Sequence, residues 1–144
     1  AARMRALLER ARAADITHMA FGDLFLADIR AYREQQLADT GITPLFPLWG
    51  TADDTWALAR EMLDGGLRAV LTCVDPRQLD AGFCGREFDA ALLSQLPPTV
   101  DPCGENGEFH TFCHAGPMFE HPVAVAVGET LTRDGFCFAD VLPR

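Results

Sequence analysis

The chain has 144 residues, of which 49% are hydrophobic and 23% charged, and its net charge is −9. This composition is typical of a globular protein with a real core. The acidic balance disfavours a nucleic-acid groove, which needs a basic surface, and no apolar run approaches the roughly 20 residues that cross a bilayer. We therefore expect neither nucleic acid nor a membrane as a partner.

The residue types exclude several kinds of catalysis. All twelve basic residues are arginine, and the lack of lysine excludes a Walker lysine, a Schiff-base lysine and a Ser–Lys pair. Ser94 is the only serine and falls in a predicted helix, which argues against a serine hydrolase. The five cysteines form no CxxC motif and no signal peptide is recognised, so free thiols in the cytoplasm are expected.

A zinc site is the one metal centre that the sequence raises as an alternative. Cys103, His110, Cys113 and His114 lie close together in the sequence, but their spacing matches no standard zinc pattern. We therefore predict no metal site.

The first third of the chain predicts helices that alternate with short strands. Residues 3–14 are strong helix formers, residues 16–21 predict a buried strand that ends at Gly22 and Asp23, and residues 26–38 predict a second helix. An aspartate at the carboxyl end of a strand is well placed for a ligand, although it is equally well placed to cap the next helix.

Two polar residues of the second helix, Arg30 and Glu34, lie one turn apart. They are either a surface ion pair, which contributes little to stability, or part of a site. Residues 43–49 should be extended because two prolines forbid a helix there, and this segment ends at Trp49. A further helix is predicted over residues 53–64.

Residues 67–74, LRAVLTCV, form a near-continuous apolar run that is typical of a parallel strand buried on both faces. The order strand, helix, strand, helix, strand predicts an α/β fold with a partial Rossmann-like parallel sheet and flanking helices. We assign residues 1–75 to this part. Such a sheet would expose an edge, which favours association into a homo-oligomer.

Residues 76–144 predict a smaller α+β part. A helix is expected over 86–96, a strand over 107–113, and a hairpin from strands 121–127 and 135–141 with its turn at Arg133-Asp134-Gly135. A crevice between two such parts is a common place for a ligand.

The stretch from Asp101 to Pro117, DPCGENGEFHTFCHAGP, combines glycines with ionisable groups. Strand alternation would put Phe109, Thr111 and Cys113 on one face, and Glu108 and His110 on the other, about 7 Å apart. Glycines before them allow the backbone to approach a ligand closely. Two interpretations remain open: a site that positions a substrate or moves protons, or a tight turn whose Glu and His are solvated.

Four segments, in this order, resemble the diphthine–ammonia ligase family. They are GDLFLADIRAYREQQL, GITPLFPLW, GREFDAALL and DPCGENGEFHTFCHAGP. Family members are ATP pyrophosphatases of the adenine nucleotide alpha hydrolase group, whose domain is a HUP-type parallel sheet. The residues that match the family's motifs are Gly22, Arg30, Glu34, Trp49, Glu105, Asn106, Gly107, Glu108, Phe109, His110 and Thr111. Asn106 and His110, where other members often carry Gly and Glu, resemble the bacterial branch.

The resemblance implies ATP-dependent amide formation. A carboxylate would attack the α-phosphate of ATP, pyrophosphate would leave, and ammonia would displace AMP. Glu105, Glu108 and His110 would be catalytic. Substrate and nucleotide would be bound by Gly22, Asp23, Arg30, Glu34, Trp49, Asn106, Gly107 and Thr111.

The family's phosphate-binding loop, Ser-Gly-Gly-Lys-Asp, is not in this sequence. We therefore expect it upstream, where it would bind ATP and most of the Mg²⁺, and we expect the present chain alone to be inactive. The alternatives are a non-catalytic nucleotide- or metabolite-binding module, or a related ATP pyrophosphatase with a different acceptor. A thiolation enzyme would need paired reactive cysteines, which this sequence lacks.

Overall fold

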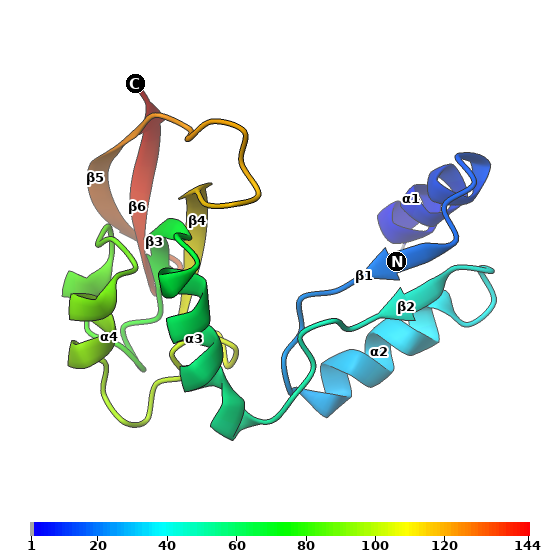
Figure 1. The fold of residues 1–144 in the computed structure, drawn as a ribbon, viewed down its shortest axis with the longest axis horizontal. Coiled ribbons are helices and arrows are strands. Elements are labelled where there is room, and N and C mark those ends of the chain that lie inside the picture. Colours follow the sequence, from blue (N-terminus) through cyan, green and yellow to red (C-terminus); the bar gives the residue numbers. More distant parts are fainter. Residues whose placement is uncertain (1) are drawn as a thin grey trace. The chain divides into compact units, whose positions relative to one another are not determined.

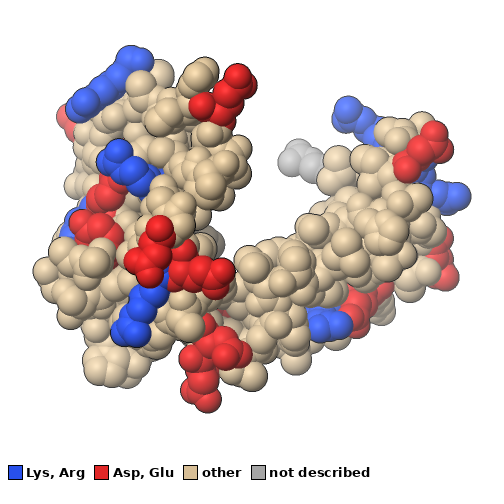
Figure 2. Space-filling view, viewed as in Figure 1, with Lys and Arg blue, Asp and Glu red and all other residues tan. Residues whose placement is uncertain are grey.

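The computed structural model describes residues 2–144, and the chain forms two compact units (Figure 1). One unit runs to Ala52 and the other covers Asp53–Arg144. No helix of the described residues is long and apolar enough to cross a membrane. On the face shown in Figure 2, tan and red atoms separate the described arginine side chains, so that they form no continuous basic surface there.

The first unit is a small parallel α/β arrangement. It contains α1 (Ala2–Ala13), β1 (His18–Ala20), α2 (Ala27–Leu37) and β2 (Thr43–Leu45). The two strands pair in parallel, with Met19 opposite Pro44. A parallel pair needs a crossover connection, and α2 supplies it. The core of this unit is built by the side chains of Leu8, Ala11, Leu37 and Ile42, against which Met4, Met19 and Phe21 pack.

The second unit is built on a four-stranded antiparallel sheet. Its strands are β3 (Arg68–Val74), β4 (Phe109–Ala115), β5 (Val125–Arg133) and β6 (Phe136–Pro143), in the spatial order β4-β3-β6-β5. The helical elements are η1 (Ala52–Asp54), α3 (Thr55–Asp64), η2 (Ala81–Phe83) and α4 (Ala90–Gln95). The α/β class with a small parallel sheet, followed by an α+β part, is thus confirmed.

The prediction that residues 67–74 belong to the parallel sheet is wrong. Strand β3 is antiparallel to both of its neighbours, β4 and β6. Its apolar run indicated burial correctly, because five of its seven residues are buried. A central antiparallel strand that is covered by helices is also buried on both faces. The apolar run of residues 67–74 therefore did not indicate the direction of the strand.

The compact division of the chain therefore falls earlier than the predicted boundary near residue 76. Since β3 pairs with β4 and β6, residues 53–75 share a core with the C-terminal part. That core includes Leu71, Val74, Leu79 and Leu92, all at most 2% exposed.

Two local predictions have different outcomes. The hairpin turn is confirmed, because β5 and β6 pair around Asp134 and Gly135, whose φ angles are 53° and 83°. The helix predicted over 86–96 is shorter. It begins only after Asp89, whose side chain accepts a hydrogen bond from the N–H of Leu92 at 2.7 Å. Residues 86–88 instead bond to β3 in extended form.

Candidate functional site

The loop of residues 101–108 is organised by two buried carboxylates. The first is Asp101, which is 8% exposed. Its Oδ1 accepts the backbone N–H groups of Cys103 at 2.9 Å and Glu105 at 3.2 Å. Its own carbonyl accepts the N–H of Gly104 at 3.0 Å. Because these bonds close consecutive turns, the loop has a defined shape although it contains no helix or strand.

The second carboxylate, Glu108, is only 1% exposed. Its Oε1 accepts the backbone N–H of Asp101 at 2.8 Å and the side-chain amide of Asn106 at 3.1 Å. Its Oε2 is equally buried and has no hydrogen-bond partner among the described residues. A buried carboxylate oxygen without a donor is costly. Glu108 therefore closes the loop with one oxygen and keeps the other able to accept a bond from a small donor.

Glu108 and His110 occupy different environments. Strand β4 begins at Phe109, so Glu108 belongs to the loop and its side chain is buried, whereas His110 is exposed. The expectation that the two form one polar pair on a strand face therefore does not hold in this structure. The other half of that prediction is confirmed: Phe109, Thr111 and Cys113 line one cavity of about 110 Å³.

The thiol of Cys103 extends from this loop to the first residue of α3 and has a raised pKa. Its Sγ donates to the carbonyl of Thr55 at 3.5 Å. Burial, followed by the charges of Asp101 and Glu105, raises the pKa of Cys103 to about 12. Because the thiolate is the reactive form, this group stays inert at neutral pH.

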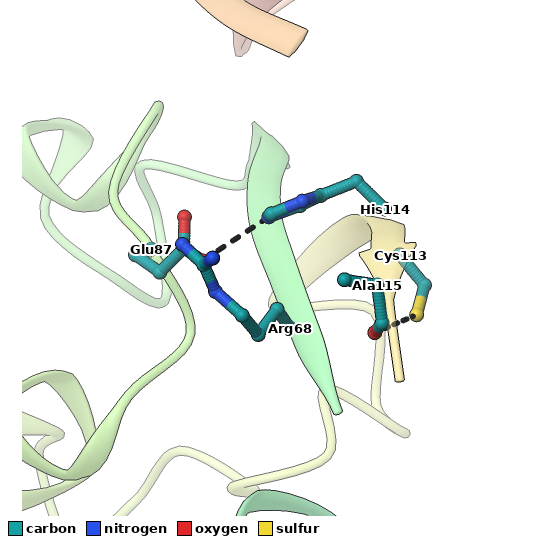
Figure 3. A network of polar contacts seen from close by, with 5 residues as sticks. All are labelled: Arg68, Glu87, Cys113, His114 and Ala115. Atoms are coloured by element: carbon teal, nitrogen blue, oxygen red, sulfur yellow. Dashed lines mark hydrogen bonds and ion pairs between the residues drawn. The ribbon is translucent and has the colours of Figure 1, made fainter. Parts of the chain in front are cut away.

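Three of the four residues of the zinc alternative, Cys103, Cys113 and His114, make other contacts, and His110 is exposed. Cys113 donates to the carbonyl of Ala115 at 3.5 Å, and Nε2 of the buried His114 lies 3.1 Å from Oε1 of Glu87 (Figure 3). Among the described residues, no group of three or more His, Cys, Asp or Glu side chains is arranged to hold a metal ion.

Glu87 joins His114 to Arg68, whose Nε lies 3.1 Å from the same carboxylate oxygen (Figure 3). This network was not predicted from the sequence, because Arg68 and His114 lie 19 and 27 residues from Glu87. It connects the start of β3 with the end of β4 and with the extended segment before α4. We therefore assign this network a structural role, which is to hold these three segments together.

Asp75, which is not among the residues predicted from the sequence, connects the end of β3 with the 101–108 loop. Its backbone N–H donates to the carbonyl of Glu108 at 2.9 Å. Its carboxylate accepts hydrogen bonds from Nε and a terminal nitrogen of Arg77, both at 2.8 Å, and from the side-chain amide of Gln78 at 3.1 Å. The Arg77 bonds hold the pKa of Asp75 well below its usual range, so this buried carboxylate remains charged at neutral pH.

The first unit gathers the other predicted site residues where its two parallel strands end. Gly22 and Asp23 follow β1, Trp49 follows β2, and Arg30 and Glu34 lie on α2. Nε of Arg30 donates to Glu34 at 2.9 Å, and its guanidinium lies 4.8 Å from the Trp49 ring centroid. The carboxyl ends of parallel strands are a usual place for a ligand in α/β proteins.

Three neighbours of this group were not predicted from the sequence: Phe21, Arg33 and Phe46. Arg33 donates from Nε to Asp23 at 3.4 Å and lies 5.1 Å from the Phe21 ring. Phe46 lies 4.7 Å from the Arg30 guanidinium. Each aromatic residue directly follows a strand, one position beyond its last paired residue. That position was the signal that could have found them.

The structure thus assembles two groups of predicted residues, one in each unit. Glu105, Asn106, Gly107 and Glu108 lie in the loop of the second unit, and His110 and Thr111 follow in β4. Gly22, Asp23, Arg30, Glu34 and Trp49 belong to the first unit.

Comparison with known proteins gives a consistent family. Residues 54–140 match the family described as "Diphthamide synthase C-terminal domain". One curated relative, a diphthine–ammonia ligase of Danio rerio, is 31% identical over 123 residues, which cover 81% of this chain and 47% of the relative. The chain therefore spans about half the length of this relative. The match of residues 54–140 agrees closely with the second unit of the structure.

Proposed function

Since the chain belongs to the family of the diphthamide synthase C-terminal domain, we propose that it is part of an ATP-dependent amide-forming ligase. The proposed reaction activates a carboxylate by adenylation, with release of pyrophosphate, and ammonia then displaces AMP. The observation that carries the proposal is the buried Glu108, which has one oxygen fixed by the loop and one without a partner among the described residues.

Glu108 is assigned to the ammonia side of the reaction. A carboxylate oxygen can hold ammonium by charge-assisted hydrogen bonds, and Oε2 is the oxygen that the loop leaves for this contact. Because Oε2 is shielded from solvent, a ligand can reach it only when part of its cover moves. Asn106 is exposed and its side-chain amide donates to Oε1 of the same carboxylate, and we assign the opening to a rotation of this side chain.

His110 and Glu105 are assigned to the same reaction at different steps. A neutral imidazole can take the proton of ammonium near pH 7, and His110 is exposed at the start of β4, two residues after Glu108. Glu105 is assigned to the acceptor and would attract a positively charged group on it. Gly107 and Thr111 are assigned to substrate binding. Gly107 has no atom within 4 Å of the position of an added Cβ, and Thr111 lines the cavity that it shares with Phe109 and Cys113.

ATP enters this proposal as a substrate. The chain contains no lysine, so the lysine of the family's phosphate-binding loop would come from another segment. The described residues contain no cluster that fits a metal ion, so Mg²⁺ is not assigned to residues of this chain. Accordingly, residues 1–144 alone are not expected to complete the reaction.

The proposal is tested by measuring pyrophosphate release from the full-length gene product with ATP and a panel of candidate carboxylates, with and without ammonium. We expect release that depends on one carboxylate, and formation of its amide only when ammonium is present. Binding of ATP without any release of pyrophosphate would contradict the ligase and favour a non-catalytic binding module. Release of pyrophosphate with a different nucleophile would identify a related ATP pyrophosphatase.

A further inference from the structure

Three aromatic rings form a continuous platform where the parallel strands of the first unit end. Phe21 and Phe46 are stacked with their centroids 5.7 Å apart, and Trp49 meets Phe46 edge-on at 5.8 Å. We call these three rings the aromatic platform. Helix α2, which lies beside β2 in Figure 1, contributes both arginines that contact these rings.

Two guanidinium groups cover the platform. Arg30 lies 4.7 Å from the centroid of Phe46 and 4.8 Å from that of Trp49, while Arg33 lies 5.1 Å from that of Phe21. They are three residues apart on one helix, so they project from the same side of it. A cation over an aromatic face is attracted by the ring quadrupole. The platform therefore already holds cations of its own.

The contacts of the two guanidiniums leave most of their donors for another group. Each guanidinium has five N–H donors in a planar fork. The bonds found for the described residues use only Nε of each: Arg30 to Glu34 at 2.9 Å, and Arg33 to Asp23 at the long distance of 3.4 Å. The Arg30–Glu34 pair is also substantially exposed, with side-chain exposures of 38% and 47%, so solvent weakens it.

We propose that Arg30 and Arg33, held on the aromatic platform, form a binding site for an oxyanion, either a phosphate group or a carboxylate. The terminal nitrogens of an arginine match the spacing of two oxygens on either group. Contact with the rings restricts the guanidiniums before the anion arrives, so that less side-chain freedom is lost on binding. The source of the anion, a nucleotide or the carboxylate acceptor, rests on the proposed function; the existence of the site does not.

The same geometry argues against an external cation on this platform. A quaternary ammonium ion would have to displace Arg30 from Phe46 and Trp49, because the guanidinium lies within 5 Å of both centroids. Asp23 and Glu34 would then lose their cationic partners or compete for the new one. Tetramethylammonium, a quaternary ammonium ion, therefore serves as the negative control, which should not bind.

The test uses the full-length gene product without turnover and reads the indole fluorescence of Trp49. The signal is assigned by subtracting the response of Trp49→Phe, which keeps an aromatic ring. Separate titrations use inorganic pyrophosphate, AMP, acetate and tetramethylammonium. We expect saturable changes with pyrophosphate or AMP if the anion is a phosphate, and with acetate if it is a carboxylate. No response to tetramethylammonium is expected.

Arg30→Gln should weaken anion binding by about ten-fold or more, because a charge-assisted bidentate contact is lost. Arg10→Gln removes the same charge from an exposed position of α1 and should leave binding unchanged. Equal losses in both variants, or a saturable response to tetramethylammonium alone, would overturn the proposal. Because no pyrophosphate is released in these titrations, an inactive ligase would not affect them, and a failed titration would not affect the ligase assay.

Discussion

At the scale of single residues, carboxylates that are buried in the second unit carry both structure and the proposed chemistry. Glu108 and Asp101 close the loop through backbone N–H groups, and Asp75 connects this loop to the end of β3. A sequence can show that such carboxylates are present. It cannot show which of their oxygens receives a donor, because the donors come from backbone groups whose positions depend on the folded loop.

The Asp75–Arg77 pair predicts a specific dependence of stability on pH. Its bonds lower the pKa of Asp75 in the folded state, so the stabilisation is fully present above the unfolded value of about 3.9 and is lost as the pH falls through the lower folded value. Arg77→Gln removes this partner. The difference in unfolding free energy between wild type and Arg77→Gln should be constant above about pH 5 and should shrink below about pH 4.

Urea unfolding at a series of pH values measures this difference. Arg86→Gln is the matched control, because Arg86 also lies over a phenylalanine, Phe83 at 4.7 Å, as Arg77 does over Phe136 at 5.5 Å, but donates to the neutral side chain of Gln95. Its effect on stability should not follow the titration of Asp75. An Arg77→Gln effect that stays constant down to about pH 2.5 would show that Asp75 has no partner-dependent pKa shift.

At the scale of elements, two glycines of the 101–108 loop allow the cost of backbone strain to be distinguished from the cost of a steric clash. Gly104 and Gly107 both have positive φ, 71° and 82°. A Cβ on Gly104 would lie 2.7 Å from the carbonyl oxygen of Phe109 and 3.2 Å from its ring, whereas a Cβ on Gly107 would meet no atom within 4 Å. Strain of the backbone is thus common to both positions, and a clash is present at only one.

We predict that Gly107→Ala lowers the free energy of unfolding by ~1 kcal/mol, the cost of a left-handed backbone for alanine. Gly104→Ala should cost a further ~1–3 kcal/mol, because the loop must move away from β4 to make room. Urea unfolding of both variants measures the two costs. Equal losses would mean that the loop does not pack against Phe109 as the structure has it.

The elements also show what the sequence could and could not predict. Most elements were predicted close to their positions, because helix formers, prolines and apolar runs act locally. The direction of β3 was predicted wrongly, since pairing with residues about forty positions later leaves no mark in LRAVLTCV itself. The short α4 was overestimated because the extended pairing of Glu87 with Val70 outweighs the helix propensity of its segment.

At the scale of the whole molecule, the segment that matches the family, residues 54–140, covers nearly all of the second unit. The residues named from the sequence for the reaction fall into this unit and into the first one. Within the first unit, Arg30, Glu34 and Trp49 are in contact as a group. Phe21 and Phe46 could have been proposed from their positions directly after the two strands, whereas the contact of Arg33 with Asp23 and Phe21 depends on the fold and leaves no mark in the sequence.

The central claim is that Glu108 acts on ammonia and not on ATP. It is tested most directly in the full-length gene product by comparing Glu108→Gln with Glu120→Gln, which alters an exposed glutamate of the same unit. Glutamine keeps an oxygen that can accept the loop bonds, so the fold should survive. The account predicts that Glu108→Gln loses amide formation while ATP–pyrophosphate exchange with the carboxylate persists, and that Glu120→Gln retains both. Unchanged amide formation in Glu108→Gln would contradict it.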